Sequence, residues 1–239
     1  MRKANFPVFN YNINGADLER VYVMRDWGVL LHCELSPKYR IENLVSAGNR
    51  LLGIVIRNTK CFTDIATSLL LFNSLVRSKL EYASPIWNPS YASYQYSIEM
   101  IGTKQIPSLL LFWKVYVKFP FSGHAGELRS LFSVHQPQTR RKIADLVLLY
   151  KLLNCLIDSP ELFEEIKLVV PKSGLRPTQK LFHVTISRTS HRQHTNIIRA
   201  CSELNGTIVD GSFLNFFDNS VGIFARDCLE WLTRDDDKP

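Results

Sequence analysis

Residues 41–55, IENLVSAGNRLLGIV, decide the fold class of this chain. Apolar residues recur there at the three- and four-residue spacing that marks one face of a helix. The apolar set is Ile41, Leu44, Val45, Gly48, Leu51, Leu52 and Val55. Polar residues fill the opposite face, where Asn43, Ser46, Arg50 and Arg57 lie. The stretch therefore predicts an amphipathic helix that buries one side in a core.

Further helices are predicted along the chain. Asp64 can cap a second helix, and the apolar run of residues 65–80 forms two stripes, so we expect this helix to be buried over most of its circumference. A third helix is predicted from about Thr139 to Ile157. A fourth should begin at Ser159-Pro160 and end before Pro171. Prolines and glycines interrupt residues 102–138, to which no element is assigned.

The two ends of the chain differ from this helical middle. Residues 1–36 are rich in β-forming residues, and Asn14-Gly15 and Trp27-Gly28 punctuate them, which predicts two or three short strands. Beyond Pro177 the helical pattern weakens into basic and polar segments. We therefore predict a mainly α fold, with short N-terminal β-strands in residues 1–37, a helical domain in residues 38–170, and a partly irregular, poorly ordered C-terminal extension in residues 171–239.

Composition narrows the class of protein. Of the 239 residues, 46% are hydrophobic, which is enough for one sizeable core. The net charge of +7 favours a polyanionic partner such as nucleic acid. No unbroken apolar segment of signal-peptide length follows Met1, and no apolar stretch reaches the roughly 20 residues that cross a bilayer. Five widely spaced cysteines fit reduced thiols. We expect an intracellular protein, nuclear or cytoplasmic, that is neither secreted nor bound to a membrane.

The sequence offers little support for a self-contained enzyme. Two-metal phosphoryl transfer needs converging carboxylates, and the only adjacent aspartates, residues 235–237, lie at the C-terminus, where a solvated tail is the simpler interpretation. A zinc site could be drawn from His183, His191, His194 and Cys201, but only His191-x-x-His194 has the short spacing of structural zinc ligands. No Gly-x-Ser-x-Gly elbow and no phosphate-binding glycine-rich loop is present.

Basic residues are the more informative feature. Arg140, Arg141 and Lys142 stand at the start of the third predicted helix, where cations oppose the positive end of the helix dipole. A bound phosphate would reverse that cost, which makes the cluster a candidate anion site. The alternative is that these side chains extend into solvent or pair with carboxylates such as Glu127.

Two other groups of residues have the same two interpretations. Arg188, His191, Arg192 and His194 form a second basic cluster, in a predicted loop. The aromatic residues Trp87, Tyr91, Tyr94 and Tyr96 could stack on bases, although packing of the connection is the simpler explanation.

Several segments resemble, in order, the region downstream of the polymerase core in jockey-type non-LTR retrotransposon reverse transcriptases. The first is RDWGV at residues 25–29, followed by Leu35-Ser36. The longest is LVRSKLEYASPIWNP at residues 75–89. A third combines Arg140-Arg141, Asp145-Leu146, LYKLLN at 149–154 and IDSPEL at 157–162, and weaker similarity continues through residues 188–199. The chain departs from the family pattern at Pro107 and Pro137.

This resemblance covers about residues 10–220 and implies a fragment of an RNA-directed DNA polymerase. It implies palm-edge strands in residues 1–37 and a thumb-like helical domain that contacts the template–primer backbone, with the missing palm and fingers as further partners. The expected contact residues are Arg140, Arg141, Lys142, Arg188 and Arg192. The full-length family enzyme uses Mg²⁺, whereas this chain lacks the catalytic aspartates, and we expect it to hold no cofactor and to be inactive alone. The alternative is a helical scaffold or protein-interaction module without a nucleic-acid function.

Overall fold

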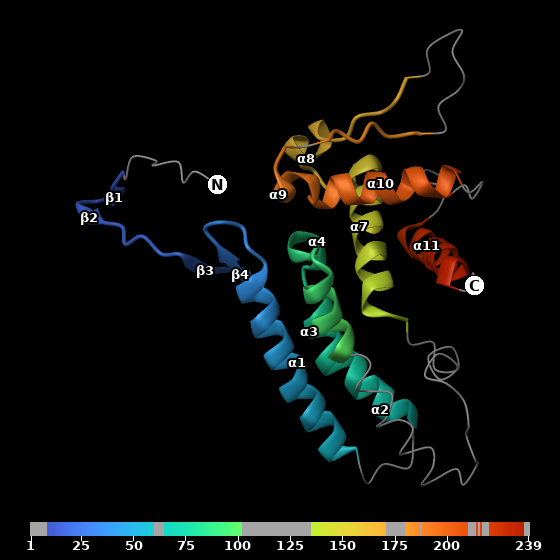
Figure 1. Cartoon of the computed structure of the whole chain (residues 1–239), viewed down its shortest axis with the longest axis horizontal. Helices are drawn as coiled ribbons and strands as arrows, with labels where there is room; N and C mark the ends of the chain where they lie inside the picture. The colour runs from blue at the N-terminus through green and yellow to red at the C-terminus, as the bar shows by residue number, and fades with distance from the viewer. Residues whose placement is uncertain are drawn as a thin grey trace.

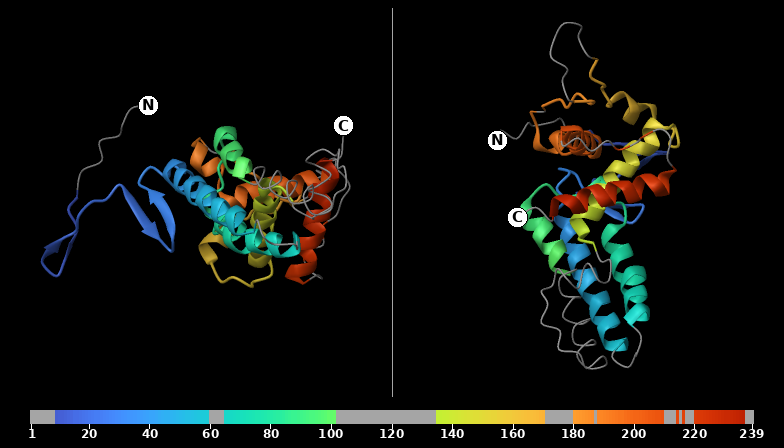
Figure 2. Two further views of the ribbon diagram at one scale, coloured as in Figure 1. Left: turned by 90° about the horizontal axis from the view of Figure 1, so that it is seen from below. Right: turned by 90° about the vertical axis from the view of Figure 1, so that its right-hand side faces the viewer.

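The computed structural model describes residues 9–59, 65–101, 135–170, 180–186, 188–209, 214, 216 and 220–236. These residues form a mainly α-helical protein, as predicted, with two small antiparallel β-hairpins near the N-terminus. Figure 1 shows the β1–β2 hairpin extending away from the helical body, whereas β4 lies at the start of α1, and Figure 2 shows the same arrangement from below.

Both hairpins close through the two-residue turns that the sequence marks. They pair β1 (Asn12–Ile13) with β2 (Ala16–Asp17), and β3 (Val23–Asp26) with β4 (Val29–His32). The turn residues have positive φ angles, 51° at Asn14, 84° at Gly15, 45° at Trp27 and 78° at Gly28. Two successive positive φ angles are typical of the type I′ turn, whose twist matches that of the paired strands. Four short strands therefore replace the two or three predicted.

Helix α1 (Lys38–Asn58) is the predicted amphipathic helix, and its apolar face forms one wall of a first core. We call this cluster the α1 core. Its buried members are Val29, Ile41, Leu44, Leu52, Val55, Phe72, Val76, Leu80, Trp87, Ile98 and Ile101. The predicted polar face is exposed at Asn43, Ser46, Arg50 and Arg57. Helical periodicity alone therefore identified the buried side of α1 correctly.

The second helix is continuous from residue 65 to 81 but changes pitch in its middle. It consists of α2 (Ile65–Leu71), the π-helical turn η1 (Phe72–Arg77) and α3 (Ser78–Glu81). Among its described side chains, burial recurs every four residues, at Ser68, Phe72, Val76 and Leu80. An α-helix repeats after 3.6 residues, so a four-residue stripe drifts around it, and the wider π turn offsets that drift.

The expected burial over most of this helix is wrong. Leu70 is 67% exposed and Leu75 is 42% exposed, whereas Leu71, the third residue of the second apolar stripe, is partly buried against the α1 core. A single buried stripe meets the α1 core, because α1 covers one side of the helix only. The predicted cap, Asp64, lies outside the described residues.

A short turn then leads toward the second half of the molecule. Helix α4 (Ser84–Trp87) follows Ala83 and buries Trp87. A further helical segment at residues 92–101 returns Ile98 and Ile101 to the α1 core. Of the aromatic residues in this connection, Trp87 is buried, Tyr94 is half-buried, and Tyr91 and Tyr96 are exposed.

Helix α7 (Pro137–Leu153) begins two residues earlier and ends four residues earlier than predicted. Pro137 occupies its first helical position, where the missing amide hydrogen costs nothing. Helix α8 (Pro160–Glu164) is shorter than predicted, because the chain leaves it to pair in extended form. The amide of His183 donates to the carbonyl of Lys167 at 2.7 Å, and the amide of Val169 donates to the carbonyl of Leu181 at 2.9 Å.

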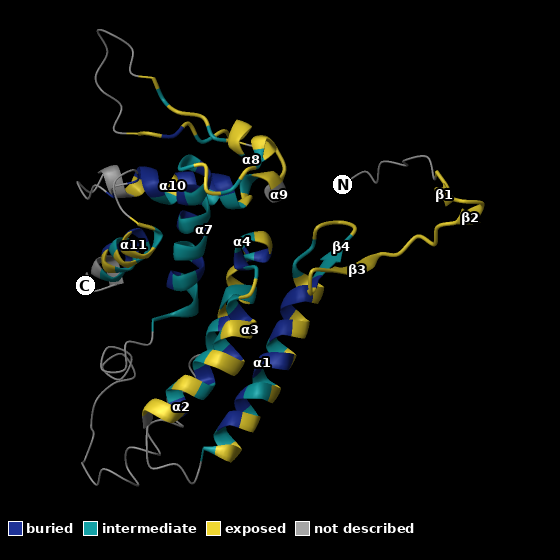
Figure 3. Ribbon diagram, turned by 180° about the vertical axis from the view of Figure 1, so that it is seen from behind, coloured by how far each residue is buried: buried dark blue, intermediate teal, exposed yellow. Residues whose placement is uncertain are grey.

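The C-terminal segment is more regular than the expected poorly ordered extension. It contains α9 (Ser190–Gln193), α10 (Asn196–Val209) and α11 (Val221–Asp236). Helices α10 and α11 pack on α7 in a second cluster, the α7 core (Figure 3). Its buried members are Leu146, Leu149, Tyr150, Leu152, Phe182, Ile197, Ala200, Cys201, Leu204, Leu214, Phe216, Phe224 and Cys228. The buried apolar residues of the described chain therefore form two clusters, one within residues 29–101 and one within residues 146–228.

Native-state alkylation tests the α7 core. Burial raises the pKa of Cys201 and of Cys228 to about 12 and removes both thiols from solvent, whereas Cys33 and Cys155 are exposed. We expect iodoacetamide to modify Cys33 and Cys155 in the folded protein and to reach Cys201 and Cys228 after denaturation, since the thiolate is the reacting form. Peptide mass spectrometry measures this, and rapid native labelling of Cys201 or Cys228 would contradict the packing.

Substitution of Gly48 tests the contact between α1 and its neighbours. A Cβ atom at Gly48 would lie 2.9 Å from Cδ1 of Ile101 and 3.1 Å from Cδ2 of Leu80. We expect Gly48→Val to lower the free energy of unfolding by about 1–3 kcal/mol through overpacking. Gly53→Val is the matched control in the same helix, because a Cβ atom there meets only Arg57 Nη1 at 3.5 Å. Equal urea denaturation midpoints for the two variants would refute the close approach.

Candidate functional site

The first ion-paired group joins the second helix to α7. Glu81, at the end of α3, accepts hydrogen bonds from Nε of Arg140 at 2.5 Å and from its Nη2 at 3.0 Å. The same carboxylate accepts from Nε of Arg77 at 2.9 Å. Arg77 also donates to Asn73 at 3.0 Å. Glu81 therefore pairs with one guanidinium from its own helix and one from α7, and the contact with Arg140 has the bidentate geometry that suits arginine and carboxylate.

Arg141 is the most deeply buried charged residue of the described chain, with 1% of its surface exposed. Its Nε donates to Oδ1 of Asn88 at 3.1 Å, and its Nη2 donates to Oε1 of Glu99 at 3.2 Å. Burial lowers the pKa of Arg141, and the charge of Glu99 opposes that effect. A buried cation requires such partners, since an unpaired charge in the interior costs several kcal/mol.

Asp145, one helical turn beyond Arg141, pairs with Arg199 of α10. Nε and Nη2 of Arg199 donate to the two carboxylate oxygens of Asp145, each at 3.0 Å. Arg199 Nη2 also donates to the carbonyl of Pro85 at 3.0 Å, and Asn88 donates to Asp145 at 3.2 Å. Burial raises the pKa of Asp145, and the hydrogen bonds from Arg199 and Asn88 oppose that rise. One guanidinium thereby links α10, α7 and α4.

These groups form one connected arrangement between the α1 core and the α7 core. We call it the polar bridge and define it as Glu81, Asn88, Glu99, Arg140, Arg141, Asp145 and Arg199. Three stretches of sequence contribute to it, residues 81–99 from the first half, residues 140–145 of α7, and Arg199 of α10. Lys142 adds an ion pair to Glu203 of α10 at 2.9 Å. The bridge is therefore the polar part of the contact between the two cores.

The structure gives intramolecular partners to most of the predicted contact residues. Arg140, Arg141 and Lys142 each pair with a carboxylate, which is one of the two alternatives that the sequence left open. The carboxylate suggested there, Glu127, lies outside the described residues. Arg192, in α9, approaches Glu165 at 3.4 Å with both side chains at least half exposed, and Arg188 is exposed.

Five residues of the bridge, Glu81, Asn88, Glu99, Asp145 and Arg199, were not among the functional candidates from the sequence. Asp145 and Arg199 lie 54 positions apart, and no local pattern indicates that they meet. One available signal was that both fall within segments that resemble the same protein family. A carboxylate among apolar residues of a predicted helix core, such as Asp145 beside Leu146 and Leu149, was a second signal, since buried acids require partners.

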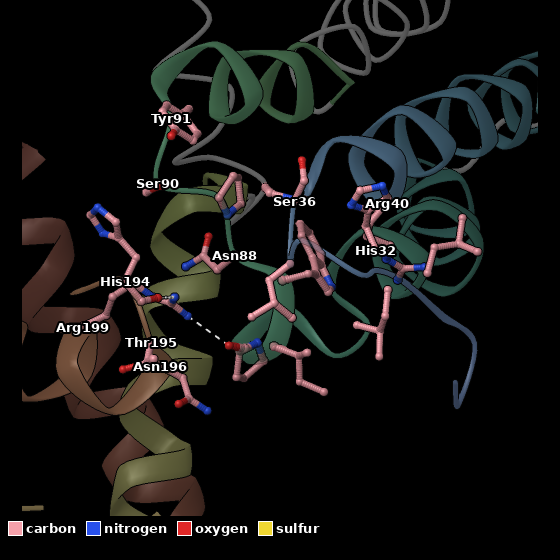
Figure 4. Close-up of a pocket in the computed structure, with 18 residues that line it drawn as sticks. His32, Ser36, Arg40, Asn88, Ser90, Tyr91, His194, Thr195, Asn196 and Arg199 are labelled. Carbon is pink, nitrogen blue, oxygen red and sulfur yellow. Dashed lines mark hydrogen bonds between the residues drawn. The ribbon is translucent and has the colours of Figure 1, made fainter. Parts of the chain in front are cut away.

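A pocket of about 360 Å³ lies beside the polar bridge. Figure 4 shows His32, Ser36 and Arg40 on one side of it, Asn88 and Ser90 in the middle, and residues 194–199 on the other side. It therefore lies where β4 and the beginning of α1 face the beginning of α10.

Replacement of Arg199 tests the polar bridge. We expect Arg199→Gln to lower the free energy of unfolding by about 3 kcal/mol at about pH 7, because Asp145 keeps its burial and loses its cation. The pKa of Asp145 in the folded state then rises further above that of the unfolded chain. Such a carboxyl favours folding at low pH and loses that contribution as the pH rises through its folded-state pKa, so the deficit should shrink toward about pH 5.

Arg192→Gln is the matched control for this substitution. It removes the same group from an exposed ion pair, so the free energy of unfolding should change by about 0.5 kcal/mol or less, without the pH dependence. Urea denaturation of both variants at several pH values measures the difference. A deficit of Arg199→Gln that stays constant or grows on acidification would refute the role of Asp145.

Other kinds of site find no support in the described part of the chain. No three His, Cys, Asp or Glu residues within it are grouped so that they could hold a metal ion. No helix within it is long and apolar enough to cross a membrane. Comparison of the chain with models of protein families, with curated proteins and with solved structures finds no match.

Proposed function

We propose that this chain is the post-palm, thumb-like region of a non-LTR retrotransposon reverse transcriptase of the jockey type. In that role it handles the template–primer backbone and depends on a separate palm for catalysis. The proposal starts from the resemblance of residues 25–29, 75–89 and 140–162 to that family. Catalysis, with its Mg²⁺, is then the task of the palm.

The observation that carries the proposal is the convergence of these segments in the polar bridge. Glu81 and Asn88 belong to the longest similar segment, Arg140, Arg141 and Asp145 to the next, and Arg199 to the last. These segments are far apart in the sequence, and mutual ion pairing gives them a shared structural role in this proposal, since loss of Arg199 would leave the buried charge of Asp145 uncompensated.

The β3–β4 hairpin supports the expectation of a missing palm. All four residues of β3 are exposed, and β3 pairs with β4 alone among the described strands. Trp27 is 87% exposed and Tyr22 is 70% exposed. An open strand edge beside exposed aromatic residues is typical of a surface that another structure covers. A palm sheet is the partner that the resemblance implies.

Backbone contact is assigned to the cations that remain accessible. Arg188 is exposed, and Arg192 holds only a weak, solvated ion pair with Glu165. Arg140, Arg141 and Lys142 are engaged by carboxylates and serve the junction of the two cores in this proposal. Phosphates would meet Arg188 and Arg192 first.

The same pairing favours a second candidate function, a helical scaffold or protein-interaction module. If the arginine cluster serves only to pair with carboxylates inside the molecule, the chain needs no nucleic acid to explain it. The exposed apolar residues of the hairpin would then bind a protein. Salt dependence separates the candidates, because phosphate contacts release counterions and apolar contacts do not.

Titration with an RNA–DNA hybrid tests the proposal. We expect the chain to bind the hybrid at low salt. The logarithm of the association constant should fall linearly with the logarithm of the salt concentration. Arg188→Gln/Arg192→Gln should reduce the magnitude of the slope by about 1.5, the effect of two lost phosphate contacts. Fluorescence anisotropy measures both quantities.

Arg57→Gln/Arg226→Gln serves as the charge-matched control. Both residues are exposed, on α1 and α11, and the slope should stay nearer to that of the unmodified chain. Absence of binding at low salt would refute the nucleic-acid function. Equal slopes for the two double variants would refute the assignment of contacts to Arg188 and Arg192.

A further inference from the structure

The pocket beside the polar bridge has cationic walls. Its lining includes Arg40, His32, His194 and Arg199, and no Asp or Glu belongs to the lining. The charge of Arg199 is balanced from outside the pocket by Asp145. The local charge of the pocket is therefore set by Arg40.

Arg40 is a buried cation without a carboxylate partner among the described residues. It is 3% exposed, and its Nε atom has no hydrogen-bond partner. Its Nη1 donates to the carbonyl of Gly28 at 3.1 Å, and its guanidinium lies 5.6 Å from the ring centre of Trp87. The other deeply buried arginine of the described chain, Arg141, has a carboxylate partner in Glu99. An anion in the adjoining pocket would complete the set around Arg40.

The beginning of α1 adds a second source of positive potential. Its first turn carries no acidic residue, and Pro37, at the cap position, provides no side-chain hydrogen bond. Ser36 and Pro37 both line the pocket. The Lys38 amide donates to Oγ of Ser36 at 3.5 Å, and the start of α1 contributes the positive end of the dipole of a 21-residue helix.

The remaining lining is largely apolar. It includes Leu30, Leu31, Leu35, Ile86 and Trp87. A pocket of about 360 Å³ exceeds what a bare phosphate ion fills, and it falls in the range of sites for small organic ligands. A ligand with an anionic group and an apolar organic part would match a lining that is basic at Arg40 and largely apolar elsewhere.

We propose that this pocket binds a small phosphate monoester, with the phosphate beside Arg40 and the start of α1 and the organic body against the apolar wall. The ligand is a free small molecule of nucleotide size, so the site is separate from the backbone contacts of Arg188 and Arg192. The proposal stands whether or not the chain derives from a polymerase.

Calorimetric titration with three probes tests the proposal. Thymidine 5′-monophosphate supplies head and body, inorganic phosphate supplies the head, and thymidine supplies the body. We expect the monophosphate to bind about tenfold more tightly than inorganic phosphate, because it also buries apolar surface, and thymidine to show no binding. Thymidine binding as tightly as the monophosphate would overturn the anion site.

Ser36→Asp separates the site from general stability. The new carboxylate would occupy the anion position at the start of α1, so the affinity for both phosphate probes should fall by about tenfold or more. The midpoint of thermal unfolding should stay equal or rise, because a carboxylate near a helix N-terminus is stabilising. Ser46→Asp is the matched control, since Ser46 is exposed on the same helix and does not line the pocket. Its affinity for both probes should equal that of the unmodified chain. Unchanged phosphate binding by Ser36→Asp would overturn the proposal.

Discussion

The ion pair between Asp145 and Arg199 is the constraint on which the rest of the arrangement depends. Asp145 is 4% exposed and points from α7 toward the junction of the two cores. A carboxylate in that position requires a cation with fixed geometry, and Arg199 supplies two hydrogen bonds of 3.0 Å each. Because Arg199 also bonds to the carbonyl of Pro85, the pair fixes α10 relative to α4 as well.

The polar bridge gives the junction specificity that apolar packing lacks. Apolar faces slide past one another at little cost, whereas ion pairs with defined hydrogen bonds permit one register. Glu81 and Arg141 extend the same constraint along α7. The cations of the arginine cluster thereby act within the molecule, so the proposed contacts with polyanions are assigned to exposed residues such as Arg188.

The β3–β4 hairpin and Arg40 do not follow this pattern of internal ion pairing, and both are candidate binding sites. The β3–β4 hairpin exposes aromatic residues beside an open strand edge, and both features favour contact with another structure. Arg40 lies buried next to a pocket without a carboxylate. A folded protein tolerates such features where a partner or ligand supplies the missing contact, so these two places are where binding is best sought.

The sequence by itself determined the local elements. The 3.6-residue period fixed α1 and the centre of α7, and the dipeptides Asn14-Gly15 and Trp27-Gly28 fixed both hairpin turns, because these features depend on neighbours along the chain. Tertiary structure alone decided that the arginine cluster is paired internally, that Asp145 meets Arg199, and that α10 and α11 complete a core with α7. Ion pairing and core membership depend on residues dozens of positions apart, whose proximity no local pattern encodes.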